Sequence, residues 1–232
     1  EQSENMDIDM DLRRDDDAAF GPLSVTAGTL LPERRGPGVL MGAFGNVEVT
    51  AVARVYGASE LGVLAITAPG EAHPRVDYVG GELFVGLDAA GGGAVTQGQT
   101  EGWSRPFRDA VAAAVASAGV LPEPVDGVST VEDEVLAAAV LTEPARLASA
   151  ALQGAPVVLA LSRDCLVIVG AEDEAGFVRA LDLAEELYDV GGPLVSAHPL
   201  TVAVGGWAPF AWIERFPALE LRIQRVLRLF GV

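Results

Sequence analysis

The stretch APVVLALSRDCLVIVG, residues 155–170, decides the fold. It contains two short runs rich in branched residues, 156–161 and 165–169, separated by the polar triplet Ser162-Arg163-Asp164. Two such runs around a three-residue loop predict a β-hairpin. Because both runs are apolar on both faces, we expect a sheet that is covered on both sides or continued by other strands.

Helices are predicted on both sides of this hairpin. Upstream, Ser129 and Glu132 fit a capping box, and apolar residues follow at helical spacing. The proline in residues 142–144 restarts or kinks that helix. Downstream, acidic residues open a second helix over 173–190, and residues 194–204 return as a strand that Pro199 interrupts. The result is a helix–hairpin–helix–strand unit.

The N-terminal half has the pattern of a β-rich region. Residues 47–56 alternate between apolar and other side chains, as in a half-buried strand. Residues 61–67 form another strand candidate, and 75–79 and 82–87 flank Gly80-Gly81, a two-residue hairpin signal. The polar stretch that follows, up to Thr100, is interpreted as a loop or linker.

These patterns define an α+β fold with three parts. Residues 1–20 form an acidic tail, 21–100 a β-rich domain or subdomain, and 101–232 an α+β domain. The last part is expected to begin with a helix capped by Ser104 and to end in an amphipathic helix.

The charge is strongly acidic. Thirty-three Asp and Glu residues stand against 15 basic residues, all of them arginine, which gives a formal net charge of −18. This balance argues against nucleic-acid binding, which needs clustered basic residues, and favours solubility or a basic protein partner. The tail contains Asp15, Asp16 and Asp17. It is interpreted as a solvated tail, with docking against a basic partner as the alternative.

The C-terminal helix, expected after Pro217, carries more apolar surface than one packing face needs. One interpretation is that the helix packs into its own domain. The other is an oligomer or partner interface edged by arginine. The side chains proposed for that interface are Trp212, Leu221, Arg222, Arg225 and Leu229.

The chain lacks familiar catalytic motifs. It has no glycine-rich phosphate loop, no nucleophile elbow and no zinc-protease motif, so no cofactor or metal is predicted. An enzyme or small-ligand pocket would have to use His73, His198 and Asp164, with the tryptophans as lining. Cys165 is interpreted as an unreactive core thiol, and a reactive thiol beside Asp164 remains the alternative.

The hairpin and its sequel resemble a known family. The run 155–170, the acidic helix start after it, Pro193-Leu-Val and Ala208-Pro-Phe210 are similar to the C-terminal segment of the uncharacterised bacterial YtpQ-type family. The resemblance covers about residues 130–211 and implies an α+β domain with no established catalytic residues. The order of elements is also similar to that of small acidic secretion chaperones, which is an analogy of fold only.

Together these features predict a cytoplasmic, non-enzymatic protein that acts by binding another protein or by self-association. No apolar run reaches the roughly 18 residues of a membrane span. No secretory signal is visible, and a single cysteine excludes an internal disulfide. A chaperone, an immunity-type protein or an assembly component would fit.

Overall fold

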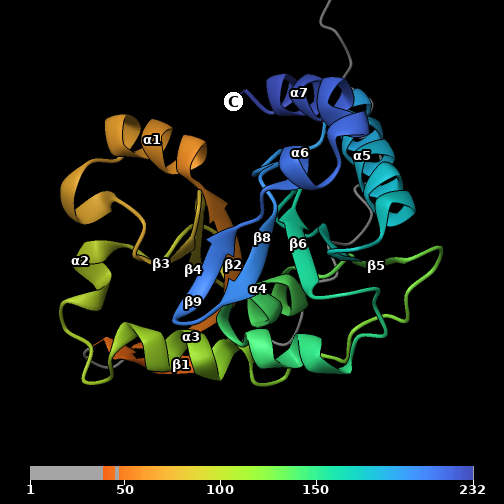
Figure 1. Ribbon diagram of the computed structural model, residues 1–232. Coiled ribbons are helices and arrows are strands. Elements are labelled where there is room, and N and C mark those ends of the chain that lie inside the picture. Colours follow the sequence, from red (N-terminus) through yellow and green to blue (C-terminus); the bar gives the residue numbers. More distant parts are fainter. Residues whose placement is uncertain (1–38, 45–46, 232) are drawn as a thin grey trace, which may run out of the picture. The chain divides into compact units, whose positions relative to one another are not determined.

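The protein is an α+β structure built on two antiparallel sheets (Figure 1). This computed structural model describes residues 39–44 and 47–231, so the acidic tail lies outside the described residues. The first sheet has the order β1-β2-β4-β3, and the second has the order β5-β7-β6-β8-β9. The first-sheet strands are Val39–Phe44, Val47–Gly57, Leu83–Ala89 and Val76–Gly80. Those of the second sheet are Val128–Val131, Leu166–Gly170, Pro156–Ala160, Leu200–Ala203 and Gly206–Pro209.

Two helices fill the core that the sheets share. These are α3, Phe107–Val115, and α4, Glu134–Thr142. Every residue of α4 from Val135 to Leu141 is buried, and Figure 1 shows the helix among strands of both sheets. The same hydrophobic cluster contains side chains of β2 and β4 together with side chains of β6 and β7. The β-rich segment and the α+β segment therefore share one core.

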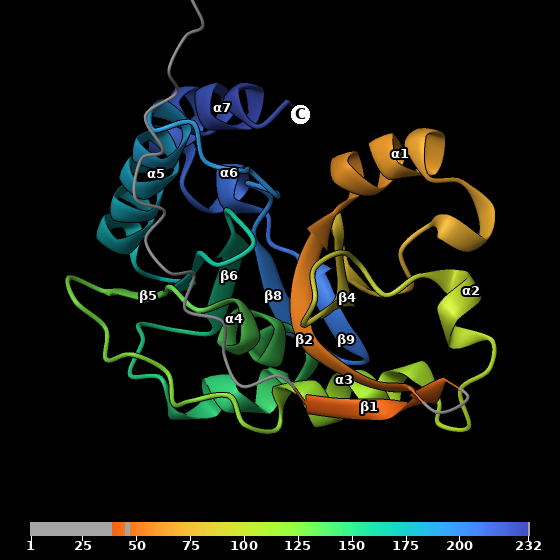
Figure 2. The same ribbon diagram turned by 180° about the vertical axis from the view of Figure 1, so that it is seen from behind.

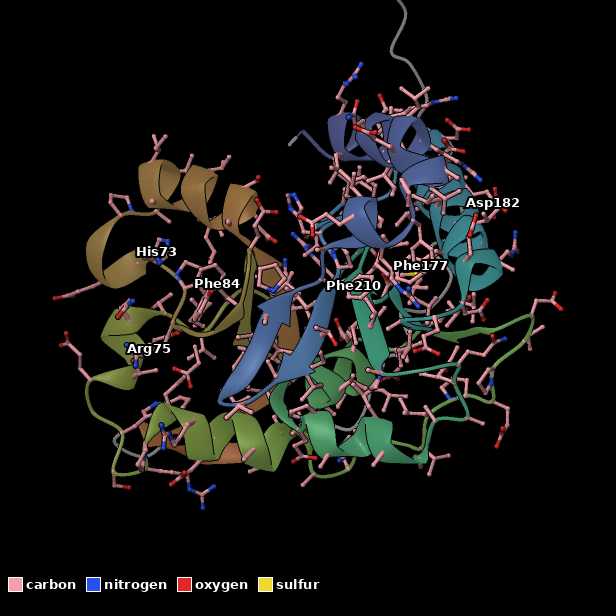
Figure 3. The ribbon with its side chains drawn as sticks, viewed as in Figure 1. His73, Arg75, Phe84, Phe177, Asp182 and Phe210 are labelled. Atoms are coloured by element: carbon pink, nitrogen blue, oxygen red, sulfur yellow. The ribbon has the colours of Figure 1, made fainter. Side chains whose placement is uncertain are left out.

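The other face of the second sheet is covered by α5, Glu174–Asp189, α6, Trp212–Arg215, and α7, Glu220–Leu229. Aromatic rings fill this layer: Phe177 lies 5.5 Å from Phe210 and 4.9 Å from Phe216 between ring centroids. Figure 3 labels Phe177, which belongs to α5, next to Phe210. The prediction of a hairpin sheet covered on both sides is confirmed.

The outer face of the first sheet carries α1, Ala58–Thr67, and the short α2, Gln97–Thr100. Figure 2 shows α1 on the side of this sheet remote from α5. Short 3-10 helices at Gly70–Ala72, Pro144–Ser149 and Pro217–Leu219 complete the described elements. Within the described ranges, no helix is long and apolar enough to cross a bilayer.

The predicted cap at Ser129 is wrong. Ser129 lies in β5, where it pairs with Ile168 of β7, and its hydroxyl donates to the carbonyl of Pro122 at 2.7 Å. Helix α4 is capped instead by Asp133, whose carboxylate accepts from the Leu136 amide at 2.7 Å. Pairing with β7 carries the strand past the position where the spacing had placed a helix start.

The predicted strand at residues 61–67 is also wrong, because this run is helix α1. A short apolar run without clear alternation fits either structure, so its periodicity does not decide. The polar stretch before Thr100 contains α2, and α3 begins after Pro106 and not after Ser104. Within 194–204 the strand is Leu200–Ala203, directly after Pro199, and Leu194 forms only an isolated bridge with Ser162.

Candidate interaction surface

A cluster of charged side chains lies where β2 meets α1. Arg54 of β2 donates to Asp88 of β4 at 2.6 Å and to Glu60 of α1 at 2.7 Å. The same Glu60 oxygen accepts from Arg163, at the tip of the β6–β7 hairpin, at 2.6 Å. Glu60 therefore connects α1 to β2 of the first sheet and to the hairpin loop of the second, and its partner Arg54 is largely shielded from water, which strengthens that pair.

Tyr56 holds this cluster in place. Its hydroxyl donates to Asp88 at 2.6 Å, and its ring lies 4.6 Å below the Arg54 guanidinium. The ring crosses Gly86, where an added Cβ would come within 2.8 Å of it. Burial, and then the Asp88 carboxylate, raise the pKa of Tyr56 far above its usual value. Tyr56 therefore stays a neutral hydrogen-bond donor, and the position of Arg54 is well defined.

A cavity of about 360 Å³ adjoins the cluster, and Arg54, Tyr56, Glu60 and Arg163 are among its lining residues. The basic groups on its wall are paired with acidic groups of the same cluster. Nearby Glu134 has a raised pKa, mainly from burial and then from the Asp88 carboxylate. The arrangement contains no nucleophile next to a base, so it serves to attach α1 and offers no recognisable chemistry.

Helix α1 presents an apolar face to solvent. Leu61 is its one buried residue, whereas Val63 is 61% exposed and Ile66 is 83% exposed. Glu60 is the only charged residue of the helix, and its ion pairs turn it inward. We call the outward-facing uncharged set the α1 face; its members are Ser59, Gly62, Val63, Ala65, Ile66 and Thr67. In Figure 1 this helix projects from the first sheet.

The histidines named in the ligand-pocket hypothesis have separate partners. The ring of His73, which Figure 3 labels, contacts the carbonyls of Pro74 and Leu61 at 3.0 and 3.4 Å. His198 lies 3.0 Å from Glu82, which also accepts from Ser196 at 3.1 Å. Because Ser196 donates to the carboxylate and not to the ring, this trio lacks the order of a serine nucleophile and its base.

Asp164 and Cys165 are explained by the hairpin loop. Asp164 accepts from the Ser162 hydroxyl at 2.7 Å at the exposed tip. Burial, and then the carboxylates of Asp164 and Glu132, raise the pKa of Cys165 to about 11. The thiol is therefore almost entirely protonated at neutral pH, which favours the core-thiol interpretation over a reactive one.

Two further cavities lie elsewhere. One of about 410 Å³ is lined by residues that include Arg75, Trp103 and Arg105, and one of about 380 Å³ by residues that include Tyr78 and Trp207. Neither His73 nor His198 lines any of the three cavities described here. Among the described residues, no group of three or more His, Cys, Asp or Glu side chains is placed to hold a metal ion.

The C-terminal helix α7 packs against α5. Its Arg222 donates to Asp182, labelled in Figure 3, and to Glu185 at 2.9 Å, while Arg225 lies 3.6 Å from Glu185. Arg222 thus faces α5 of the same chain, whereas the side chain of Arg225 is 72% exposed. Trp212 is buried against Phe177 and is not available to a partner.

Two of the other interface residues reach the surface to different degrees. Leu221 is exposed, and Leu229 is partly buried. Asp15, Asp16 and Asp17 lie outside the described residues.

Sequence reasoning did not single out Arg54, Glu60 and Asp88. The alternation of β2 does place Arg54 on the face opposite Ala53 and Val55, and this pattern was the available signal. The cross-strand partner and the helix that supplies Glu60 depend on the order of strands in the sheet.

Comparison with known proteins adds no identification. The chain matches no protein-family model, no curated protein and no solved structure. The resemblance to the YtpQ-type family stays a prediction.

Proposed function

We propose that this chain is a non-enzymatic protein-binding or assembly protein that engages its partner through the α1 face. The observation that carries the proposal is the exposure of Val63 and Ile66, which lie one helical turn apart on a helix without outward charge. Apolar residues clustered on one exposed element are typical of protein interaction sites, whereas scattered ones are normal.

The attachment of α1 supports this proposal. A helix that has one buried apolar residue is held by the ion pairs of Glu60 with Arg54 and Arg163. Such pairs fix the position of α1 and leave its apolar residues free for a partner. In the C-terminal region, proposed from sequence as the interface, Arg222 is paired within the chain and Trp212 is buried, so we prefer α1 as the candidate.

The composition of the chain indicates which class of partner to expect. The net charge of −18 disfavours nucleic acid and anionic membrane surfaces and favours a partner with basic groups. A cytoplasmic location is part of the proposal and rests on the single cysteine.

The proposal is tested by affinity capture with the full chain and three variants of it, two double and one single. Val63→Glu with Ile66→Glu places charges on the α1 face. Val120→Glu with Val204→Glu is the matched control, since both residues are exposed valines outside α1. Leu221→Glu tests the C-terminal helix.

We expect a protein that is retained by the wild type, the valine control and Leu221→Glu, and lost from the α1 variant. Mass spectrometry identifies the captured protein, and circular dichroism verifies that each variant is folded. A partner that the α1 variant still retains, or one lost only from Leu221→Glu, would move the interface away from α1.

A further inference from the structure

No contact among the described residues explains why position 62 is a glycine. It lies in the middle of α1, where glycine costs roughly 0.5–1 kcal/mol relative to alanine. An added Cβ at Gly62 would meet no atom of the described residues within 4 Å, so no contact among those residues requires a glycine here. Its backbone is ordinary helix as well, because Gly62 is not among the glycines with positive φ.

A glycine in the middle of an exposed helix is useful where the backbone of a second helix must pass close to it. Gly62 lies on the α1 face next to Val63, with Ser59 and Ala65 also small and exposed. Packed helices lie about 8–10 Å apart depending on the side chains at the contact, and small residues at the crossing favour the short end of this range. The exposed pair Val63 and Ile66 would supply those larger side chains.

We infer that the partner of the α1 face is an α-helix of another protein, one that crosses α1 at Gly62 and carries basic residues beside its apolar stripe. This inference rests on the proposed function and names the chemistry of the partner at the same site. It is supported by two observations, the open space at Gly62 and the charge around α1.

The charge argument concerns the C-terminal end of α1. The last turn contains no basic residue, so the negative end of the helix dipole has no cationic side chain of the helix itself near it. Exposed Glu71 follows in the next turn and adds negative charge. A lysine or arginine of the partner at this end would be attracted by both.

A second copy of the chain fits this surface less well. Two copies would each bring a net charge of −18 and a Glu71 to the same contact, and like charges oppose association. A basic helix meets the same face with opposite charge. The two occupants also respond oppositely to salt, because screening weakens attraction and relieves repulsion.

The test uses two synthetic helical peptides of about 21 residues, about 30 Å long. Both carry the same leucine and alanine stripe. One has lysine on its flanks and the other has glutamate. Fluorescence anisotropy measures the binding of each peptide to the full chain, from about 50 to about 500 mM salt, a range in which screening becomes strong.

Variants of the full chain locate the contact. Gly62→Leu blocks close approach, and it leaves the fold intact because the site is open. Val120→Leu is the control at an exposed position outside α1. We expect the lysine peptide to bind at least about tenfold more tightly than the glutamate peptide, a difference of about 1.4 kcal/mol. Binding should weaken with salt, fall about tenfold or more in Gly62→Leu and stay unchanged in Val120→Leu.

Other results overturn the inference. Equal binding of the two peptides would contradict the inference that the partner is basic. Undiminished binding to Gly62→Leu would contradict the inference that the partner helix crosses α1 at Gly62. A wild-type dimer in light scattering that Gly62→Leu dissociates would make a second copy the occupant. In each case a partner lost from the Val63→Glu, Ile66→Glu variant would leave the proposed function standing, so the two failures are distinguishable.

Discussion

Helices α1 and α4 are nearly alike in composition and opposite in environment. Their sequences are ASELGVLAIT and EVLAAAVLT, each with a single glutamate and otherwise no charge. Residues 135–141 of α4 are all buried, whereas α1 buries Leu61 alone. A helix that is apolar all round is normally buried, so α4 follows the rule and α1 departs from it. The difference teaches that local hydrophobicity does not by itself determine burial.

The two helices are also held by different interactions. Packing against β2, β4 and α3 surrounds α4 on all sides. Helix α1 leaves the sheet directly after β2 and is held through Glu60, with Leu61 beneath it. Removal of packing should therefore affect α4, and removal of charge should affect α1.

The largest difference is expected from a charge placed in each helix. Ala139→Asp buries a carboxylate at a fully enclosed position and should cost about 4 kcal/mol or more, a large part of the stability of a domain. Ala65→Asp, at an exposed position of α1, should cost about 1 kcal/mol or less. Urea denaturation followed by circular dichroism compares them. Equal losses would show that α1 is packed as tightly as α4.

The next effect comes from shortening an aliphatic side chain. Leu141→Ala leaves a cavity in the shared core and should lower the free energy of unfolding by about 2–5 kcal/mol. Ile66→Ala removes exposed atoms and should change it by about 0.5 kcal/mol at most. Thermal denaturation measures both. A large loss in Ile66→Ala would mean that the α1 face is covered within the chain.

A smaller effect is expected from Glu60→Gln, which removes the charge that Arg54 and Arg163 share. The expected cost is about 1–2 kcal/mol, because hydrogen bonds to charged groups are stronger than neutral ones. Amide hydrogen exchange should accelerate in residues 58–67 and stay unchanged in α4. Glu71→Gln is the control, since Glu71 is exposed. Uniform acceleration would contradict a separate attachment of α1.

The smallest effect is expected from Gly62→Ala, which makes α1 more similar to α4. Because the new methyl group meets no atom within 4 Å in the described part of the chain, it should stabilise the protein by roughly 0.5–1 kcal/mol. Gly86→Ala is the opposite case, since its Cβ would lie 2.8 Å from the Tyr56 ring and should destabilise. A Gly62→Ala variant no more stable than wild type would remove the cost on which the helix-crossing inference depends.

Much of the fold was predictable because its signals are local. The hairpin around Ser162-Arg163-Asp164, a hairpin near Gly80-Gly81 and the strand over 47–56 all rest on alternation and turn residues, and the structure confirms them. The second turn lies one residue later than predicted, at Gly81-Glu82, because Gly80 pairs with Leu83. Helix α5 begins after its capping residue Asp173, as expected. The errors at Ser129 and at 61–67 arose where local patterns fitted two structures equally well.

The candidate site was much less predictable. The sequence indicated an acidic protein without catalytic motifs, but it directed attention to the C-terminal helix. The exposure of Val63 and Ile66 depends on which face of the first sheet α1 occupies. The partners of Glu60 come from β2 and from a hairpin more than 100 residues away. No local pattern contains that information.

By itself, the sequence determined the α+β class, the main turns and the acidic character of this protein, because each depends on neighbouring residues or on composition. Only the tertiary structure decided which apolar helix is buried and which is exposed. Strand order places α4 in the core that both sheets share and leaves α1 on an outer face. The physical reason is that burial depends on what surrounds a segment, and contacts between distant parts of the chain determine those surroundings.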